Sequence, residues 1–136
     1  MPDLGSTEMN MLWASLVLGL VYLVAAAVAS VGQRGMRWAV GPRDEAAPPI
    51  NAIGGRFDRA WKNYVETLPL FVGAVLAEAS AGHGSALGPL GAQLYFWRRV
   101  AYLPMYAIGL PFVRTLAWTA AIVGIVLLLV ACLPGT

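Results

Sequence analysis

A charge-free stretch near the N-terminus constrains the fold of this chain more than any other feature. No Asp, Glu, Lys or Arg occurs from Met9 to Gln33. A helix rises about 1.5 Å per residue, so about 20 apolar residues cross a hydrocarbon core about 30 Å thick. Residues 9–33 are therefore predicted to form a transmembrane helix. Because Asp3 and Glu8 precede it instead of Lys or Arg, we do not expect a cleaved signal peptide.

Three further apolar segments follow this helix. Residues 115–133 are charge-free, whereas residues 59–80 and 89–110 are apolar but contain ionisable side chains. The whole chain is 59% hydrophobic and only 12% charged, which is outside the usual composition of soluble domains. These features predict an all-α fold, an integral membrane four-helix bundle with up-down topology in a single domain, residues 1–136. The expected helices cover residues 9–33, 56–80, 89–110 and 112–133.

The basic residues predict the orientation in the membrane. They gather around the first loop and at the third turn: Arg34, Arg37, Arg43, Arg56, Arg59, Lys62 and Arg114. The opposite side, formed by both termini and the second turn, has no Lys or Arg. By the positive-inside rule the first loop is cytoplasmic and both termini are non-cytoplasmic. We expect a multi-pass integral membrane protein, in the inner membrane if the source is bacterial.

The composition argues against two classes of partner. The slightly basic pI of about 9.0 follows from this loop and does not require nucleic acid. The chain has one histidine, His83, in a glycine-rich turn, and one cysteine, Cys132, near the end of the last helix. One histidine and one cysteine do not provide a typical zinc ligand set, so we expect no metal site.

Two of the predicted helices carry polar side chains along one face. At 3.6 residues per turn, Arg59, Asn63 and Glu66 lie on the same side of the second helix, and Arg56 lies one turn earlier. The third helix repeats this spacing with Tyr95, Arg99, Tyr102 and Tyr106. An ionisable group at membrane depth costs about 2.5 to 3.5 kcal/mol on insertion scales. Such faces are therefore expected to line a bundle interior or a wet cavity.

Two interpretations of these faces remain open. In the first, the groups satisfy one another: Glu66 pairs with Lys62 or Arg99, and the other arginines reach lipid phosphates. In the second, they hold an anionic ligand near the cytoplasmic interface. The ligand's anions would then meet Arg56, Arg59, Arg99 and Arg114, and its ammonium group would meet Glu66. Because four helices enclose little cavity, such a pocket would form more easily between subunits, so we expect an oligomer.

Two stretches resemble a known family. RFDRAWKNYVETLPLF, residues 56–71, is similar to the second-helix signature of the MAPEG family, the membrane-associated proteins in eicosanoid and glutathione metabolism. RRVAYLPMYAIGLPFVRTLAW, residues 98–118, is similar to the family's region of two tyrosines followed by an arginine. The family includes microsomal glutathione transferases and leukotriene C synthase. The matching residues are Arg59, Asn63, Glu66, Pro69, Phe71, Tyr102, Tyr106 and Arg114.

This resemblance implies a homotrimer that binds glutathione between neighbouring subunits near the cytoplasmic face. The expected glutathione-binding residues are Arg56, Arg59, Asn63, Glu66, Arg99, Tyr102 and Tyr106. Arg114 is the expected catalytic residue, because a guanidinium beside a thiol favours the nucleophilic thiolate. The implied function is a glutathione-dependent transferase or peroxidase acting on hydrophobic electrophiles that arrive from the membrane lipids.

Some residues favour a different, non-enzymatic function. Trp61 stands where the family's enzymes usually have Gln, Thr67 stands where a Tyr often follows the Glu, and Arg114 follows Tyr106 one residue later than expected. The family also contains a scaffold, the five-lipoxygenase activating protein. The alternative is therefore a membrane scaffold that binds lipid or a partner membrane protein. Because Arg59, Asn63, Glu66 and both tyrosines are retained, the sequence favours the enzyme.

Overall fold

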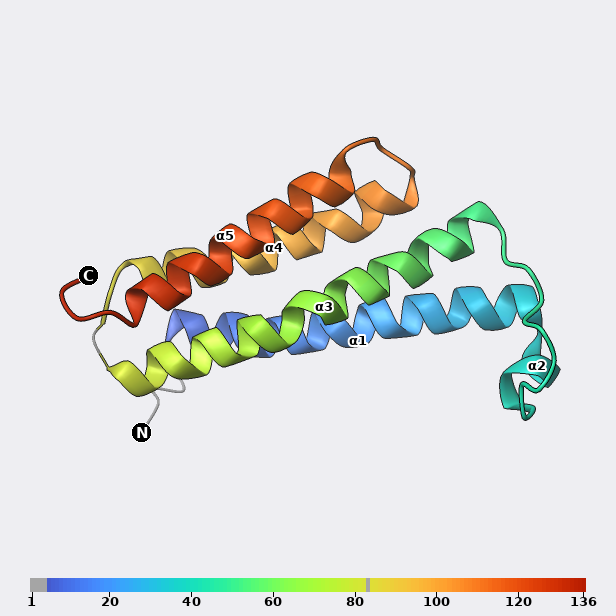
Figure 1. Ribbon diagram of the computed structural model, residues 1–136, viewed down its shortest axis with the longest axis horizontal. Coiled ribbons are helices and arrows are strands. Elements are labelled where there is room, and N and C mark those ends of the chain that lie inside the picture. The colour runs from blue at the N-terminus through green and yellow to red at the C-terminus, as the bar shows by residue number, and fades with distance from the viewer. Residues whose placement is uncertain (1–4, 83) are drawn as a thin grey trace.

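The computed structural model describes residues 5–82 and 84–136 and folds them into helices and turns, with no β-strand among them (Figure 1). His83 and Asp3 lie outside the described residues. Four helices are long: α1 (Thr7–Arg34), α3 (Ala52–Ala81), α4 (Leu87–Ala107) and α5 (Val113–Ala131). A short helix, α2 (Met36–Val40), follows α1 and lies in the loop that leads to α3. The all-helical prediction is therefore confirmed for the described residues.

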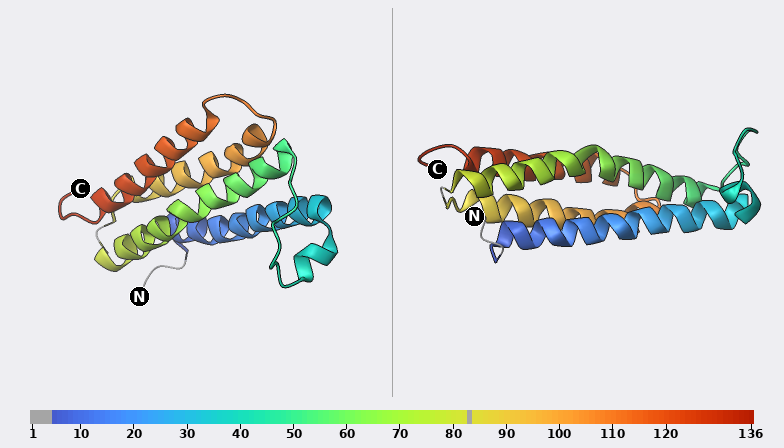
Figure 2. Two further views of the ribbon diagram at one scale, coloured as in Figure 1. Left: turned by 45° about the vertical axis from the view of Figure 1, so that its right-hand side comes forward. Right: turned by 90° about the horizontal axis from the view of Figure 1, so that it is seen from below.

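The four long helices lie side by side. α4 packs along α5, and α1 packs along α3, with further contacts between the two pairs (Figure 1). The start of α1, the α3–α4 connection and the C-terminus lie at one end of the molecule (Figure 2). α2 and the α4–α5 turn lie toward the opposite end. The residues that were expected on the cytoplasmic side, including Arg34 and Arg114, therefore gather toward that second end.

Three of the helices are long and apolar enough to cross a membrane: α1, α3 and α5. α4 is also long, but it is less apolar because polar and charged side chains interrupt it. Its crossing of the membrane remains a prediction, as does the direction in which the chain is inserted.

The side-chain cap of α3 binds the end of α1. α3 begins at Ala52, earlier than the predicted residue 56, because the Asn51 side chain accepts a hydrogen bond from Gly54 N at 2.9 Å. Gln33, in the last turn of α1, donates to Asn51 Oδ1 at 2.8 Å and accepts from Asn51 N at 2.6 Å. The cap of α3 is thus fixed to the end of α1. This contact joins two helices that a loop separates in sequence.

Close backbone contact holds α4 against α5. A Cβ added to Gly91 would lie 2.6 Å from the carbonyl oxygen of Gly124, so only glycine permits this approach. Nearby, the rings of Phe71 and Tyr95 stack with centroids 3.9 Å apart. Farther along the bundle, the Tyr22 hydroxyl donates to the Arg99 carbonyl oxygen at 2.6 Å. These contacts fix the face of α4 that carries Arg99 and the tyrosines.

Candidate functional site

The guanidinium of Arg99 is fully buried between α3 and α4. Its Nη1 donates to Asn63 Oδ1 at 2.6 Å, and its Nη2 donates to Thr67 Oγ1 at 2.6 Å. Short hydrogen bonds from a charged donor are roughly twice as strong as neutral ones. Arg99 and Asn63, both predicted from sequence to bind the ligand, are therefore bonded to each other within one protomer.

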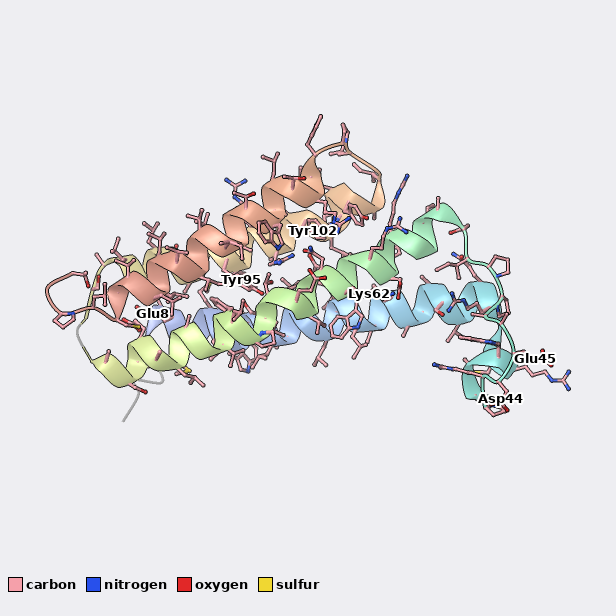
Figure 3. All side chains as sticks on the ribbon, in the orientation of Figure 1. Glu8, Asp44, Glu45, Lys62, Tyr95 and Tyr102 are labelled. Atoms are coloured by element: carbon pink, nitrogen blue, oxygen red, sulfur yellow. The ribbon has the colours of Figure 1, made fainter. Side chains whose placement is uncertain are left out.

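Aromatic rings complete the surroundings of Arg99. Its Cζ lies 5.5 Å, 5.6 Å and 5.7 Å from the ring centroids of Tyr64, Tyr95 and Tyr102. Cations at such distances are attracted to the ring faces, and more strongly where water is excluded. Figure 3 shows Tyr95 and Tyr102 between α3 and the α4–α5 pair. Arg99 thus forms the buried wall of the candidate site.

Beside this wall is an open hollow between α3 and α5, with a volume of about 320 Å³. Asn63, Glu66, Arg114, Thr115 and Trp118 line it. The side chains of Glu66 and Arg114 are exposed, and neither forms an ion pair within 4.0 Å among the described residues. The hollow therefore presents one carboxylate and one guanidinium that are both available to a ligand.

The two predicted tyrosines lie at different depths in this region. Tyr106 is partly exposed, and its hydroxyl accepts a hydrogen bond from Arg59 Nε at 3.0 Å. Its ring stacks on that of Tyr102, with centroids 5.2 Å apart. The buried Tyr102 hydroxyl has no hydrogen-bond partner in the described part of the chain. Tyr102 thus has an unused hydrogen-bonding group below the ring of Tyr106.

Arg56 occupies a different position from the other candidates. Its Nη1 donates to the Ala107 carbonyl oxygen at 3.0 Å. A Cβ on Gly109, whose φ is +83°, would lie 2.8 Å from the Arg56 Cζ. The guanidinium thus packs against the backbone where α4 ends and the turn to α5 begins. In this position Arg56 fixes the turn that precedes Arg114.

The structure corrects one pairing expected from the sequence. Lys62 Nζ lies 2.8 Å from Asp58 Oδ2, so it pairs with Asp58 and the expected pairing with Glu66 is wrong. Asp58 lies four residues before Lys62, which is the more favourable order on a helix. Nor does Glu66 form an ion pair with Arg99 within the described residues. The first interpretation, in which these groups neutralise one another, therefore does not explain Glu66.

Sequence reasoning missed two residues of the site. Thr67 binds Arg99, and Trp118 lines the hollow. Each lies four residues after a predicted site residue, Thr67 after Asn63 and Trp118 after Arg114, so helical spacing could have identified both. Among the described residues, no group of three or more His, Cys, Asp or Glu side chains is placed to hold a metal ion.

Comparison with known proteins identifies one similarity. The profile of the MAPEG family matches residues 11–134, nearly the whole chain. The match includes all four long helices except the first residues of α1. No curated protein and no solved structure matches the chain significantly.

Proposed function

The chain belongs to the MAPEG family, and from this membership we propose that it is an integral membrane enzyme that activates glutathione for transferase or peroxidase chemistry. The observation that carries the proposal is the hollow between α3 and α5, where Glu66 and Arg114 are both available. An enzyme requires Arg114 to point into a pocket, whereas a scaffold tolerates an Arg114 that points to lipid phosphates. Its place in the lining of this hollow favours the enzyme.

The available groups match the chemistry of glutathione. At neutral pH this tripeptide carries two carboxylates, one ammonium group and a thiol. Arg59 and Arg114 offer guanidiniums to the anionic groups, and Glu66 offers a carboxylate to the ammonium. The unpartnered Tyr102 hydroxyl adds a further hydrogen-bonding group. In this proposal Arg99 and Asn63 support the site as its buried wall.

Arg114 would provide the catalytic effect. A free thiol has a pKa of about 8.5, so most of it is protonated at neutral pH. A guanidinium a few ångströms away stabilises the thiolate and lowers the thiol pKa, and the proton leaves to water at the open side of the hollow. The thiolate sulfur then forms a bond to an electrophilic carbon or oxygen of the second substrate. The electron pair of the broken bond leaves with the displaced group.

The second substrate would arrive from the lipid side. Several exposed apolar side chains surround Arg114 near the start of α5: Phe112, Leu116 and Trp118. Lipophilic molecules dissolve in the hydrocarbon region and can reach such a surface without crossing water. We therefore propose hydrophobic electrophiles as the second substrate class.

A neighbouring copy would close the hollow. Glu66 and Arg114 are exposed on the single protomer, although charges at membrane depth normally face protein or a wet cavity. A homotrimer with the hollow at the subunit boundary would cover both groups. Gly73 and Ala77 lie on the outward surface of α3 and have the small-xxx-small spacing that lets membrane helices approach closely.

Binding and turnover measurements on two variants test this function. Arg114→Gln should lower the rate of glutathione conjugation to an aryl halide by about 100-fold, the usual cost of removing one stabilising donor. Glu66→Gln should weaken glutathione binding, measured by calorimetry, about tenfold. Lys62→Gln removes a cation on the same helix outside the hollow and should change neither quantity.

The scaffold alternative gives a different set of results. A trimeric parent protein that neither binds glutathione nor turns over the aryl halide would contradict the enzyme and favour a lipid or protein scaffold. If the parent is active but both hollow variants behave like Lys62→Gln, the enzyme uses other residues.

A further inference from the structure

The end of α1 and the α2 loop form a second, separate hollow, which we call the Trp38 pocket. Its volume is about 580 Å³, and its lining includes Arg34, Arg37, Trp38 and Arg43. Figure 3 shows Asp44 and Glu45, which also line it, at the end of the molecule opposite Glu8. None of these residues belongs to the proposed glutathione site. The pocket therefore requires its own explanation.

Two guanidiniums lie over one indole in this pocket, and a third arginine, Arg37, also lines it. The Cζ atoms of Arg34 and Arg43 lie 4.9 Å and 4.8 Å from the centroid of the Trp38 ring. Arg34 donates from Nε to the Pro48 carbonyl oxygen at 2.8 Å, and Arg43 donates from Nη2 to the Ala39 carbonyl oxygen at 3.1 Å. Each guanidinium has five N–H donors, so most remain available.

The backbone of Arg43 has an energetically unfavourable conformation. Its φ is +60°, in the left-handed region that residues other than glycine rarely adopt. This conformation accompanies the return of the loop toward α2, which brings the Arg43 guanidinium over Trp38. Such strain persists only where surrounding contacts maintain it, and it is concentrated at functional sites.

The pocket retains uncompensated positive charge and an unused donor. Asp44 and Glu45 line it, but no carboxylate lies within 4.0 Å of its arginines in the described ranges. The Trp38 Nε1 is buried and donates to no acceptor among those residues. A buried N–H without an acceptor costs free energy. The unused donors, together with the guanidiniums, suit an anion with several oxygen acceptors.

A second, apolar groove lies along the last turns of α1. Ala27, Val28, Val31, Gly32 and Met36 line a hollow of about 420 Å³ with almost no polar surface. Met36 belongs to α2, so the groove reaches the helix that carries Trp38. Met36 and Val40 are one helical turn apart on α2 and are 64% and 76% exposed. α2 thus combines an exposed apolar side with one basic residue, Arg37, a combination that suits a membrane interface.

We propose that the Trp38 pocket binds the phosphate of an anionic phospholipid, with an acyl chain along the groove on α1. The phosphate oxygens accept hydrogen bonds from Arg37, Arg43 and the Trp38 indole. The groove lies along the last turns of a membrane-spanning helix and reaches α2, the helix that carries Trp38, and a soluble phosphate would require no such apolar surface. A choline headgroup would place its fixed cation beside the arginines, so anionic headgroups are preferred.

Quenching of tryptophan fluorescence by lipids with brominated acyl chains tests this site. The detergent-purified full chain is titrated with brominated phosphatidylglycerol or brominated phosphatidylcholine. The fluorescence of the Trp38→Phe variant is subtracted from that of the parent, and the difference is the Trp38 component. Phosphatidylglycerol should quench this component to saturation at a mole fraction at least tenfold lower than phosphatidylcholine does. The double variant Arg37→Gln, Arg43→Gln should raise that mole fraction about thirtyfold, because each basic residue near an anionic headgroup contributes about fivefold.

The matched control is Lys62→Gln, which removes one exposed cation and should leave the titration unchanged. Unchanged elution in size-exclusion chromatography verifies that each variant is folded. Equal quenching by the two lipids, or a double variant that behaves like the parent, would overturn the proposal. Displacement of phosphatidylglycerol by excess glycerol phosphate would also overturn it, since the ligand would then be a soluble phosphate.

Discussion

The buried guanidinium of Arg99 separates the wall of the candidate site from its open part. Its hydrogen bonds to Asn63 and Thr67 and its three tyrosine rings stabilise the charge inside the protomer, and only its buried Nε has no partner among the described residues. Glu66 and Arg114 have no such compensation. Asn63 and Glu66 lie on the same face of α3 and can therefore have different functions, because Asn63 is buried whereas a ligand can reach Glu66.

Because Arg99 and Asn63 are buried and bonded to each other, a substitution of Asn63 should destabilise the protein. Asn63→Leu leaves one hydrogen-bonding group of the buried Arg99 cation without its partner, and bonds to charged groups contribute about 1.5 to 3 kcal/mol. We expect the free energy of unfolding in detergent, measured by denaturant titration, to fall by roughly 2 kcal/mol. Lys62→Gln removes an exposed ion pair and should change it by less than about 1 kcal/mol. Equal losses in the two variants would contradict the structural role of Asn63.

Cys132 allows a prediction about pH. Burial, and then the nearby carboxylate of Glu78, raise the pKa of its thiol above the ordinary value. Because only the thiolate reacts with alkylating reagents, the alkylation rate should rise with pH and reach half its maximum at a higher pH than for an exposed thiol. The comparison is Thr136→Cys in a Cys132→Ser background, measured with iodoacetamide across the alkaline range. Coincident pH profiles would show that Cys132 is an ordinary exposed thiol.

The residue-level predictions from sequence depended on helical spacing. Helical spacing correctly places Asn63 and Glu66 near each other, since both line the hollow between α3 and α5. Spacing alone does not choose between Asp58 and Glu66 as the partner of Lys62, because both lie four residues away, whereas the order of the two charges along the helix favours Asp58. The contact of Arg56 with Ala107 joins segments far apart in sequence, and local spacing contains no information about it.

At the level of helices, the contact between α4 and α5 sets the position of Arg114 relative to the tyrosines. Tyr102 and Tyr106 lie on α4, whereas Arg114 lies in the first turn of α5. Gly91 and Gly124 let the two helices approach closely. Arg114 follows Tyr106 one residue later than the family pattern, and the α4–α5 turn contains a left-handed Phe112 with φ +62°. The turn, rather than a continuous helix, therefore determines the direction of Arg114.

Gly124→Ala should disturb this contact. Its Cβ would lie 2.7 Å from the Gly91 carbonyl oxygen, and backbone cannot yield as a flexible side chain can. We expect a loss of about 1 to 3 kcal/mol in the free energy of unfolding, typical of overpacking, and a lower conjugation rate. Gly32→Ala on α1 is the matched control, because nothing lies within 4 Å of its added Cβ. If both alanine variants are as stable as the parent, the close contact does not limit the packing of α4 on α5.

The helices themselves could be predicted to different extents. Charge-free runs identify α1 and α5 because membrane crossing demands many consecutive apolar residues. α2 was not predicted, since five residues are too few for periodicity to show. The start of α3 was placed too late, because its cap depends on Asn51 and its contact with Gln33 rather than on apolar residues.

At the level of the whole molecule, one end gathers the polar chemistry. The start of α5, which carries Arg114, the α4–α5 turn and α2, which carries Trp38, lie toward the same end, away from the C-terminus (Figure 1). The distribution of Lys and Arg in the sequence predicted that the basic residues gather on one side. The trimer could not be tested by the fold of one protomer, because its contacts involve surfaces that face outward.

The central claim is that Arg114 activates glutathione as a thiolate. The most direct test is a glutathione titration of the detergent-purified protein at neutral pH, following the ultraviolet absorbance of the bound thiolate. The parent should give a saturable thiolate signal, Lys62→Gln should give the same signal, and Arg114→Gln should lose most of it while eluting like the parent in size-exclusion chromatography. A folded parent protein without this signal, or an Arg114→Gln variant that retains it in full, would contradict the claim.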